Sequence, residues 1–192
     1  MNEVLTALKT RRSIRKFRSD PVPQALLDEI MEAGLYAASG MDRQKTIILC
    51  LTDPDVIARL SRANAQIAGY KEGTDPFYGA PAVLVVLSPK EVPTALYDGS
   101  LVLGNLMTAA HALGLGSCWI HRARQMFDSA EGKALLQQWG LPETLRGVGS
   151  LALGLKGAYI GIGHCVIGYP DEHPEASPRR SGRIFYVGKE KR

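Results

Sequence analysis

The sequence predicts an α+β domain in which a small sheet lies between helices. The strongest observation is the continuous apolar run PAVLVVLS at 81–88, which is typical of a strand covered on both faces. Amphipathic stretches on either side of this run predict the helices that would cover it. No linker-like segment divides the 192 residues, and this length suits one domain with a substantial core.

In the N-terminal half, the spacing of apolar residues predicts three helices and one strand. The first helix covers 2–10. Pro23 suits the first turn of a second, clearly amphipathic helix. TIILCL at 46–51 is predicted as a short buried strand, and 53–68 as a helix whose inward residues include Ile67.

In the C-terminal half, the segment 97–113 is apolar on nearly all sides and stops at Gly114. A helix of this kind is expected at the centre of the core or in a subunit interface. The remaining elements are predicted as a strand at 117–121, a helix at 128–139, a strand at 164–168 and a final strand around 183–187.

A glycine-rich near-repeat occupies 147–168. GVGSLALG and GIGHCVIG share one pattern at an offset of 14 residues, which fits either a hairpin of two similar strands or a duplicated edge. Neither copy has the third glycine and following helix of a dinucleotide-binding fingerprint, so the repeat does not predict a Rossmann fold.

Composition excludes several classes of protein. Hydrophobic residues make up 45% and charged residues 22% of the chain, as in ordinary soluble domains, and no apolar run is long enough to span a membrane. Cys50, Cys118 and Cys165 stand far apart in apolar runs, which indicates buried thiols and no metal site. With no signal peptide at the start, the sequence predicts a cytoplasmic protein without a membrane partner.

Positive charge is concentrated at the two ends of the chain. The segments 9–18 and 179–192 hold twelve of the 23 Lys and Arg residues, while the stretch between them is acidic. Folding could bring both segments to one anion, and Arg matches phosphate oxygens well; alternatively, both ends are simply solvated. A nucleic-acid partner is not predicted, because basic and aromatic residues do not alternate and zinc-binding spacing is absent.

Two segments carry candidate binding residues. RRSIRKF at 11–17 follows the first helix and offers guanidinium groups, a hydroxyl and backbone N–H groups to a phosphate. AASGMDRQ at 37–44 ends the second helix in small residues, which allow a flat ring to approach, followed by polar residues that can contact its edge.

These two segments, together with PFYGAPAVLVV, GLGSCWIH, IGYP and the PRR…RIFYV tail, appear in the same order in FMN-dependent nitroreductases. The chain resembles that family almost from end to end. The resemblance implies one FMN-binding domain over 1–192, with a three-layer fold around a small mixed, mostly antiparallel sheet. It also implies an intertwined homodimer with FMN in the interface.

The resemblance further implies which residues bind FMN. The phosphate would be held by Arg11, Arg12, Ser13 and Arg15 together with a basic residue near the C-terminus, for which Arg179 is the best match and Arg180 or Arg183 the next. The ring would be contacted by Ser39, Gly40, Asp42 and Gln44 of the other subunit and by Trp119, Ile120 and His121. Asn64 would lie at the pyrimidine edge. No protein residue is implied as catalytic, since flavin N5 carries the chemistry. His111 and His164 are interpreted as core residues.

The chain departs from the family pattern at three positions. Asp42 stands where Asn is usual and Lys45 where Pro is usual. A carboxylate cannot donate a hydrogen bond as an amide does, so the contact of Asp42 with the ring is in question. Ile67 stands where some relatives carry Lys, so a positive charge near the pyrimidine would have to come from elsewhere, for instance Arg15.

The function implied by the resemblance is hydride transfer from NADH or NADPH through FMN N5 to a nitroaromatic, a quinone or a similar small acceptor. Because both substrates would use one slot, the kinetics are expected to be ping-pong. Three alternatives remain open at this point: dehalogenation or flavin fragmentation on the same fold, flavin binding without turnover, and a basic nucleic-acid-binding domain without cofactor.

Overall fold

The computed structural model describes residues 2–140, 144–145, 155–156 and 159–188. Four strands form one sheet in the order β1-β2-β6-β3, and all three pairings are antiparallel. These strands are β1 (Ile47–Leu51), β2 (Ala82–Pro89), β3 (Gly116–Ile120) and β6 (Tyr159–Gly168). Two short strands, β4 (Thr144–Leu145) and β5 (Leu155–Lys156), pair separately.

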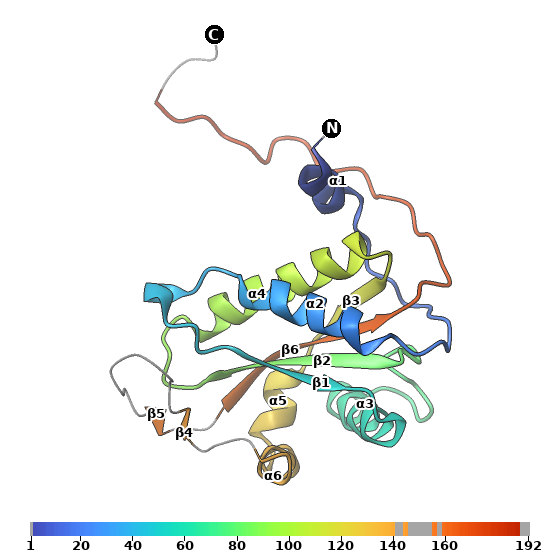
Figure 1. Cartoon of the computed structure of the whole chain (residues 1–192), viewed down its shortest axis with the longest axis vertical. Helices are drawn as coiled ribbons and strands as arrows, with labels where there is room; N and C mark the ends of the chain where they lie inside the picture. Colours follow the sequence, from blue (N-terminus) through green and yellow to red (C-terminus); the bar gives the residue numbers. More distant parts are fainter. Residues whose placement is uncertain (1, 141–143, 146–154, 157–158, 189–192) are drawn as a thin grey trace.

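Helices cover both faces of the sheet (Figure 1). On one face lie α2 (Gln24–Leu35) and α4 (Ala95–Ala112), and on the other lie α3 (Pro54–Ala68), α5 (Ala123–Asp128) and α6 (Ala130–Gln138). The first helix, α1 (Glu3–Thr10), stands apart near the end of α4, and the short 3-10 turn η1 (Gly40–Asp42) follows α2. The predicted three-layer α+β fold is confirmed.

Strand β2 is central because its sequence is apolar on both faces. Every residue of the strand is buried. Leu84 and Val86 face the layer of α2 and α4, while Val83 and Val85 face the layer of α3 and α5. Because its two faces belong to different cores, this strand joins them. Complete burial of each such side chain stabilises the fold by roughly 1.5–3 kcal/mol.

Local sequence fixes the ends of the helices. The Asp53 side chain accepts hydrogen bonds from the N–H groups of Asp55 and Val56 at the start of α3. Gly69 ends the same helix in the left-handed conformation, at a φ of 66°. At α2, Pro23 precedes the first helical residue, as its ring requires.

Three expectations about the elements need correction, and one helix was not predicted. Strand β1 is half-buried, because it is the edge of the sheet, and Ile67 is 40% exposed on the outer side of α3. The predicted helix at 128–139 corresponds to α6, which Ser129 caps, whereas the short helix α5 just before it was not predicted. The segment 183–187 forms no strand and is exposed along its length.

The second copy of the glycine near-repeat lies in β6, which extends five residues further toward the N-terminus than predicted. A side chain at Gly161 would lie 2.2 Å from the Ala123 carbonyl oxygen, so glycine here lets α5 pack against the strand. At Gly163 a side chain would meet the indole of Trp119 at 2.3 Å. The first copy, in 147–154, lies outside the described residues.

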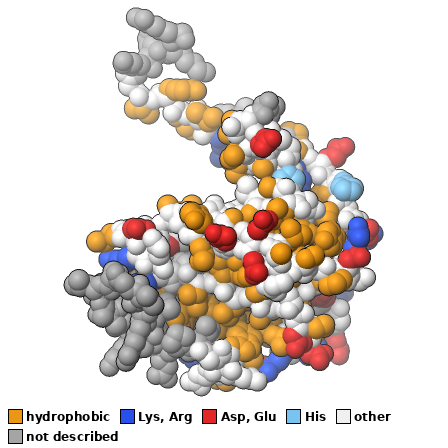
Figure 2. Space-filling view, viewed as in Figure 1, with side chains coloured by type: hydrophobic (Ala, Val, Ile, Leu, Met, Phe, Trp, Pro, Cys, Tyr) orange, Lys and Arg blue, Asp and Glu red, His pale blue; other side chains and the backbone are white. Residues whose placement is uncertain are grey.

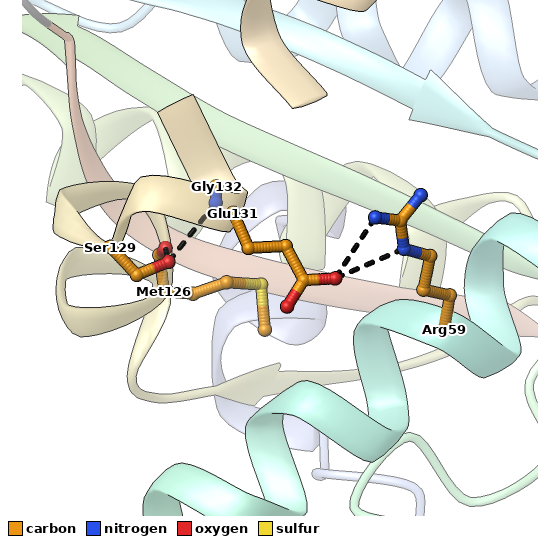
Figure 3. A network of polar contacts seen from close by, with 5 residues as sticks. All are labelled: Arg59, Met126, Ser129, Glu131 and Gly132. Atoms are coloured by element: carbon orange, nitrogen blue, oxygen red, sulfur yellow. Dashed lines mark hydrogen bonds and ion pairs between the residues drawn. The ribbon is translucent and has the colours of Figure 1, made fainter. Parts of the chain in front are cut away.

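Polar contacts join α3 to α6 across the outer layer (Figure 3). Both Nε and Nη2 of Arg59 donate to Glu131 Oε1, at 3.1 and 3.0 Å, and Ser129 Oγ accepts from the Gly132 N–H at 3.0 Å. The ion pair is about half exposed, so we expect it to contribute no more than about 1 kcal/mol.

Several large apolar side chains are half or more exposed in the part of the chain that the structure describes. Those of α1 are Val4, Leu5 and Leu8, and those near the start of α4 are Leu96, Tyr97 and Leu101; in the C-terminal tail Ile184, Phe185 and Val187 are also exposed. Figure 2 shows hydrophobic side chains on the tail, which leaves the body of the molecule near α1. Within the described residues, none of the helices meets the length and apolarity needed to cross a bilayer.

Candidate functional site

The basic segment after α1 lies against the first residues of β3. Ser13 and Ser117 form a parallel bridge, and the Ile14 N–H donates to the Ser117 carbonyl at 3.0 Å. A side chain at Gly116 would lie 2.9 Å from Ile14, so only glycine allows this approach without a shift of the segment. Backbone contacts therefore hold the predicted phosphate-binding residues beside the start of β3.

The guanidinium groups of Arg11 and Arg12 are placed differently. Arg12 Nη1 donates to the Lys9 carbonyl at 2.9 Å, which turns this side chain back onto the end of α1. Arg11 Nη1 and Ser117 Oγ are buried and have no hydrogen-bond partner among the described residues. A buried donor without a partner costs roughly 1–3 kcal/mol, so this corner can gain from an anion that supplies acceptors.

Two carboxylates lie at the other end of the basic segment. The Arg15 N–H donates to the Glu172 carboxylate, and Lys16 Nζ lies 2.8 Å from Asp171 Oδ2. The backbone N–H of Arg15 is therefore already used, while its side chain is exposed. Burial raises the pKa of the Cys118 thiol, and the nearby charges of Arg15 and Arg11 oppose this rise.

Asn64 and the end of β3 form a second polar cluster. The Asn64 side chain is completely buried, and its Nδ2 donates to the His121 carbonyl at 2.8 Å, while its Oδ1 has no partner among the described residues. Trp119 is 36% exposed, Ile120 is buried and His121 is exposed. The predicted residues at the pyrimidine edge and beside the ring are thus brought together.

These two clusters lie at opposite ends of one strand. Arg11 and Ser117 stand near the start of β3, and Asn64 contacts His121 just after its end. At about 3.3 Å per residue, Ser117 and His121 are about 13 Å apart. The strip along β3 therefore has unpaired donors at one end and an unpaired acceptor at the other.

The loop after α2 forms a compact unit of its own. Ser39 Oγ accepts from the Gln44 N–H at 3.1 Å, and Gln44 Nε2 donates to Asp42 Oδ1 at 2.7 Å. Asp42 and Gln44 have φ values of 52° and 49°, which non-glycine residues rarely adopt. The Asp42 carboxylate therefore accepts a hydrogen bond from Gln44 within the loop, since a carboxylate cannot donate one.

Asp98 fixes this loop to α4. Its Oδ1 accepts from the Gly40 N–H at 3.0 Å and its Oδ2 from the Thr94 hydroxyl at 2.8 Å. A side chain at Gly40 would lie 2.5 Å from Thr94 Oγ1, so glycine is required for the contact. A cavity of about 530 Å³ beside the loop is lined in part by Ser39, Gln44 and Asp98.

The loop and the β3 strip lie at opposite ends of α4 (Figure 1). Asp98 holds the loop, whereas His111 lies 2.8 Å (Nε2) from Thr10 Oγ1 at the end of α1. These two positions are thirteen residues apart on one helix. At 1.5 Å per residue the separation is about 20 Å, so the loop lies well away from the Arg11 and Ser117 end of the strip in its own chain.

Arg179 and Arg180 lie in the exposed C-terminal tail. The tail begins beside the basic segment, because the Arg18 N–H donates to the Tyr169 carbonyl at 2.9 Å and the Asp171 N–H to the Lys16 carbonyl at 2.9 Å. Further along, the tail passes α1 and leaves the body of the molecule (Figure 1). That Arg179 and Arg180 bind the phosphate stays a prediction.

A groove of about 920 Å³ lies elsewhere, between α3 and the segment 70–81. None of the residues predicted to bind FMN lines it. The buried Ser61 hydroxyl in this groove is already satisfied, because it donates to the exposed Asp75, which also accepts from the N–H groups of Phe77 and Gly79. The β3 strip, and not this groove, therefore carries the unpaired groups that suggest a ligand.

Sequence reasoning missed Asp98 and Ser117. Asp98 is 6% exposed, and a lone acid in an otherwise apolar helix was a visible sign of a buried partner. Ser117 gave no such sign, because a serine next to a glycine is common at the start of a strand. Its importance comes from the bridge to Ser13, which links residues far apart in the sequence.

Replacing Asp98 with alanine is expected to destabilise the fold by about 2 kcal/mol, because hydrogen bonds to a charged group contribute about 1.5–3 kcal/mol and two donors would be left unpaired. Urea unfolding measures the change. Asp128→Ala is the matched control, since Asp128 is exposed and its ion pair is long, at 4.0 Å. Equal unfolding midpoints for the two variants would contradict the assigned role.

Comparison with known proteins places the sequence and the fold in a family. The family model described as the nitroreductase family matches residues 8–155. An NADPH-flavin oxidoreductase of Vibrio harveyi is 29% identical over 197 residues, which cover 96% of this chain and 72% of that protein. A crystal structure of a nitroreductase with bound FMN from Bacteroides fragilis NCTC 9343 superposes with a TM-score of 0.81 at 26% identity, covering 98% of this chain and 100% of the other.

A nitroreductase with bound FMN from Desulfitobacterium hafniense DCB-2 superposes with a TM-score of 0.82 and covers 98% of this chain and 100% of the other. At 22% identity, it supports the fold alone. The family model covers most of the chain, and the superpositions extend over nearly all of it. The chain is therefore a member of the nitroreductase family.

Proposed function

We propose that the protein is an FMN-dependent oxidoreductase that passes hydride from NADH or NADPH to a nitroaromatic, a quinone or a similar small acceptor. The names of its relatives, which include an NADPH-flavin oxidoreductase and an NAD(P)H-dependent FMN reductase, support this class of reaction. The observation that carries the proposal is the set of unpaired groups along β3: Arg11 Nη1 and Ser117 Oγ at one end, and Asn64 Oδ1 at the other.

These groups fit the chemistry of FMN. A phosphate supplies acceptors for Arg11 and Ser117, and the imide N–H of a flavin pyrimidine supplies a donor for Asn64 Oδ1. Ser13 would assist at the phosphate end, while Trp119, Ile120 and His121 would flank the ring. FMN would accept hydride at N5 and deliver it to the acceptor, and the protein would bind and orient the three molecules.

A homodimer would complete the site. Ser39, Gly40, Asp42 and Gln44 lie about 20 Å from the Arg11 and Ser117 end of β3 in their own chain, as estimated from the rise along α4, and we propose that they contact the FMN held by a partner. The uncovered apolar side chains of α1, α4 and the tail are the kind of surface that subunit association buries. The proposed enzyme is thus one domain over 1–192, in two copies.

A single slot over the flavin would serve first the nicotinamide and then the acceptor, which predicts ping-pong kinetics. Arg179, with Arg180 beside it, would close over the phosphate from the tail. The three cysteines are all free thiols, two buried and one half-buried, and this supports a reducing compartment such as the cytoplasm.

The absorbance spectrum of the purified protein, loaded with FMN and then treated with NADH or NADPH without air, tests this proposal. We expect a flavin spectrum that bleaches with at least one nicotinamide and returns when a nitroaromatic or quinone is added. A protein that cannot be loaded with FMN, or a bound flavin that neither nicotinamide bleaches, would contradict the proposal.

A further inference from the structure

His164 is a polar residue in a position built for an apolar one. It lies on β6, fully buried, and its ring contacts those of Phe77 and Phe127 at centroid distances of 5.2 and 6.2 Å. Neither ring nitrogen has a hydrogen bond of ordinary geometry among the described residues. A buried polar group in this state costs stability, and such exceptions in native folds call for an explanation.

The imidazole faces the end of β3. Its register partner on that strand is Ile120, and the backbone groups of Ile120 and His121 act on the ring and favour its proton. Burial outweighs them, lowering the pKa of His164 to about 4. The ring is therefore neutral near pH 7, with one N–H available to a backbone carbonyl above it.

Asn64 contacts the same turn of the chain. Its Nδ2 donates to the His121 carbonyl at 2.8 Å, and its side chain is as completely buried as that of His164. The next residue, Arg122, has a φ of 76°, a conformation that is unfavourable for any residue with a side chain. Two buried polar side chains and one strained backbone position thus meet at a single turn of the chain.

We propose that His164 is a positioning residue of the flavin site, which with Asn64 holds the Ile120 and His121 peptide groups from beneath and so sets the end of β3 against the flavin ring. This inference rests on the proposed function. Strain and buried polarity persist where the surrounding structure uses them. An ordinary core would place an apolar residue at 164, and nothing else in the strand requires a histidine there.

The test separates positioning from packing. Phenylalanine at 164 extends the aromatic layer of Phe77 and Phe127 and removes the unpaired nitrogens. A purely structural His164 therefore predicts that His164→Phe is at least as stable as the wild type and binds FMN equally well. The positioning role predicts that His164→Phe folds but binds FMN about tenfold more weakly, as when a supporting hydrogen-bonding residue is lost.

The measurements are FMN titration of the cofactor-free protein by fluorescence quenching, the absorbance spectrum of the bound flavin, and urea unfolding. We expect a shifted flavin spectrum in His164→Phe and partial rescue of affinity in His164→Asn. The control is Val83→Ala. This substitution opens a cavity on β2, on the face of the sheet that packs against α3 and α5, and β2 does not pair with β3. It is expected to lose stability while keeping FMN affinity.

Equal FMN affinity and an unchanged flavin spectrum in His164→Phe would overturn this inference and leave the proposed function intact. A wild-type protein that does not bind FMN would overturn both. If His164→Phe does not fold, His164→Leu is measured by the same criteria.

Discussion

Replacing Arg11 with alanine is expected to weaken FMN binding about thirtyfold, which corresponds to about 2 kcal/mol for the loss of charge-assisted hydrogen bonds. Arg11 Nη1 has no hydrogen-bond partner among the described residues, so this nitrogen gives up no protein hydrogen bond when it binds the phosphate. Titration of the cofactor-free variant with FMN, followed by quenching of flavin fluorescence, measures the change.

Arg12→Ala is the informative comparison, because Arg12 Nη1 already donates to the Lys9 carbonyl. We expect Arg12→Ala to lose less FMN affinity than Arg11→Ala. If the tail closes over the phosphate, Arg179→Ala should lose about as much as Arg11→Ala. Arg124→Ala serves as control, since Arg124 is exposed and makes only a 4.0 Å ion pair. If Arg11→Ala binds FMN with wild-type affinity, the FMN phosphate does not bind at this end of β3.

Stability is expected to fall by the order of 3 kcal/mol between pH 6.5 and 4 because of His164 alone. Burial lowers the pKa of His164 from 6.5 to about 4 in the folded protein. Above pH 6.5 the group is neutral in both states and contributes no pH dependence. As the pH falls through this window, the unfolded chain takes up a proton that the folded chain cannot, and below about pH 4 the loss is complete.

Urea unfolding of the wild type and of His164→Phe across this range isolates the effect. Other groups titrate in the same window, but they are common to both proteins, so the difference between the two profiles reports on His164. We expect the stability of His164→Phe relative to the wild type to rise as the pH falls. Parallel profiles would mean that the imidazole protonates as easily in the folded state as in the unfolded chain.

Sequence patterns predicted those elements that local spacing determines. The apolar run at 81–88 and the helical spacing at 24–35 and 53–68 correspond to β2, α2 and α3. The edge position of β1 was not predictable, because TIILCL is apolar whether one side or both sides are paired. Helix α5 was not predicted, because its six residues are too few to show helical spacing of apolar residues.

The tail explains the error at 183–187. Residues 184–187 have the composition of a strand, but they form no strand among the described residues and remain exposed. Propensity describes what a segment can form once it is paired and packed, not where its partner lies. A partner subunit is the natural place for such a segment, in agreement with the proposed dimer.

The candidate site was predictable in part. Arg11, Ser13 and Asn64 were identified through family motifs, and the structure brings each of them to β3. Motifs could not reveal that Arg12 turns back onto α1 or that Glu172 takes the Arg15 N–H. Nor could they distinguish His164 from an ordinary core residue, because that judgement depends on the Ile120 and His121 peptides above its ring.

The most direct test of the account is complementation between two defective variants. Arg11→Ala impairs the β3 strip, and Ser39→Ala/Gln44→Ala impairs the loop that the partner would contribute. A heterodimer purified through two different tags should then contain one intact and one doubly impaired site. We predict that it binds one FMN per dimer with wild-type affinity, although both parent homodimers bind FMN weakly. Weak binding at both sites of the heterodimer, or a monomer that binds FMN with full affinity, would contradict a site shared between subunits.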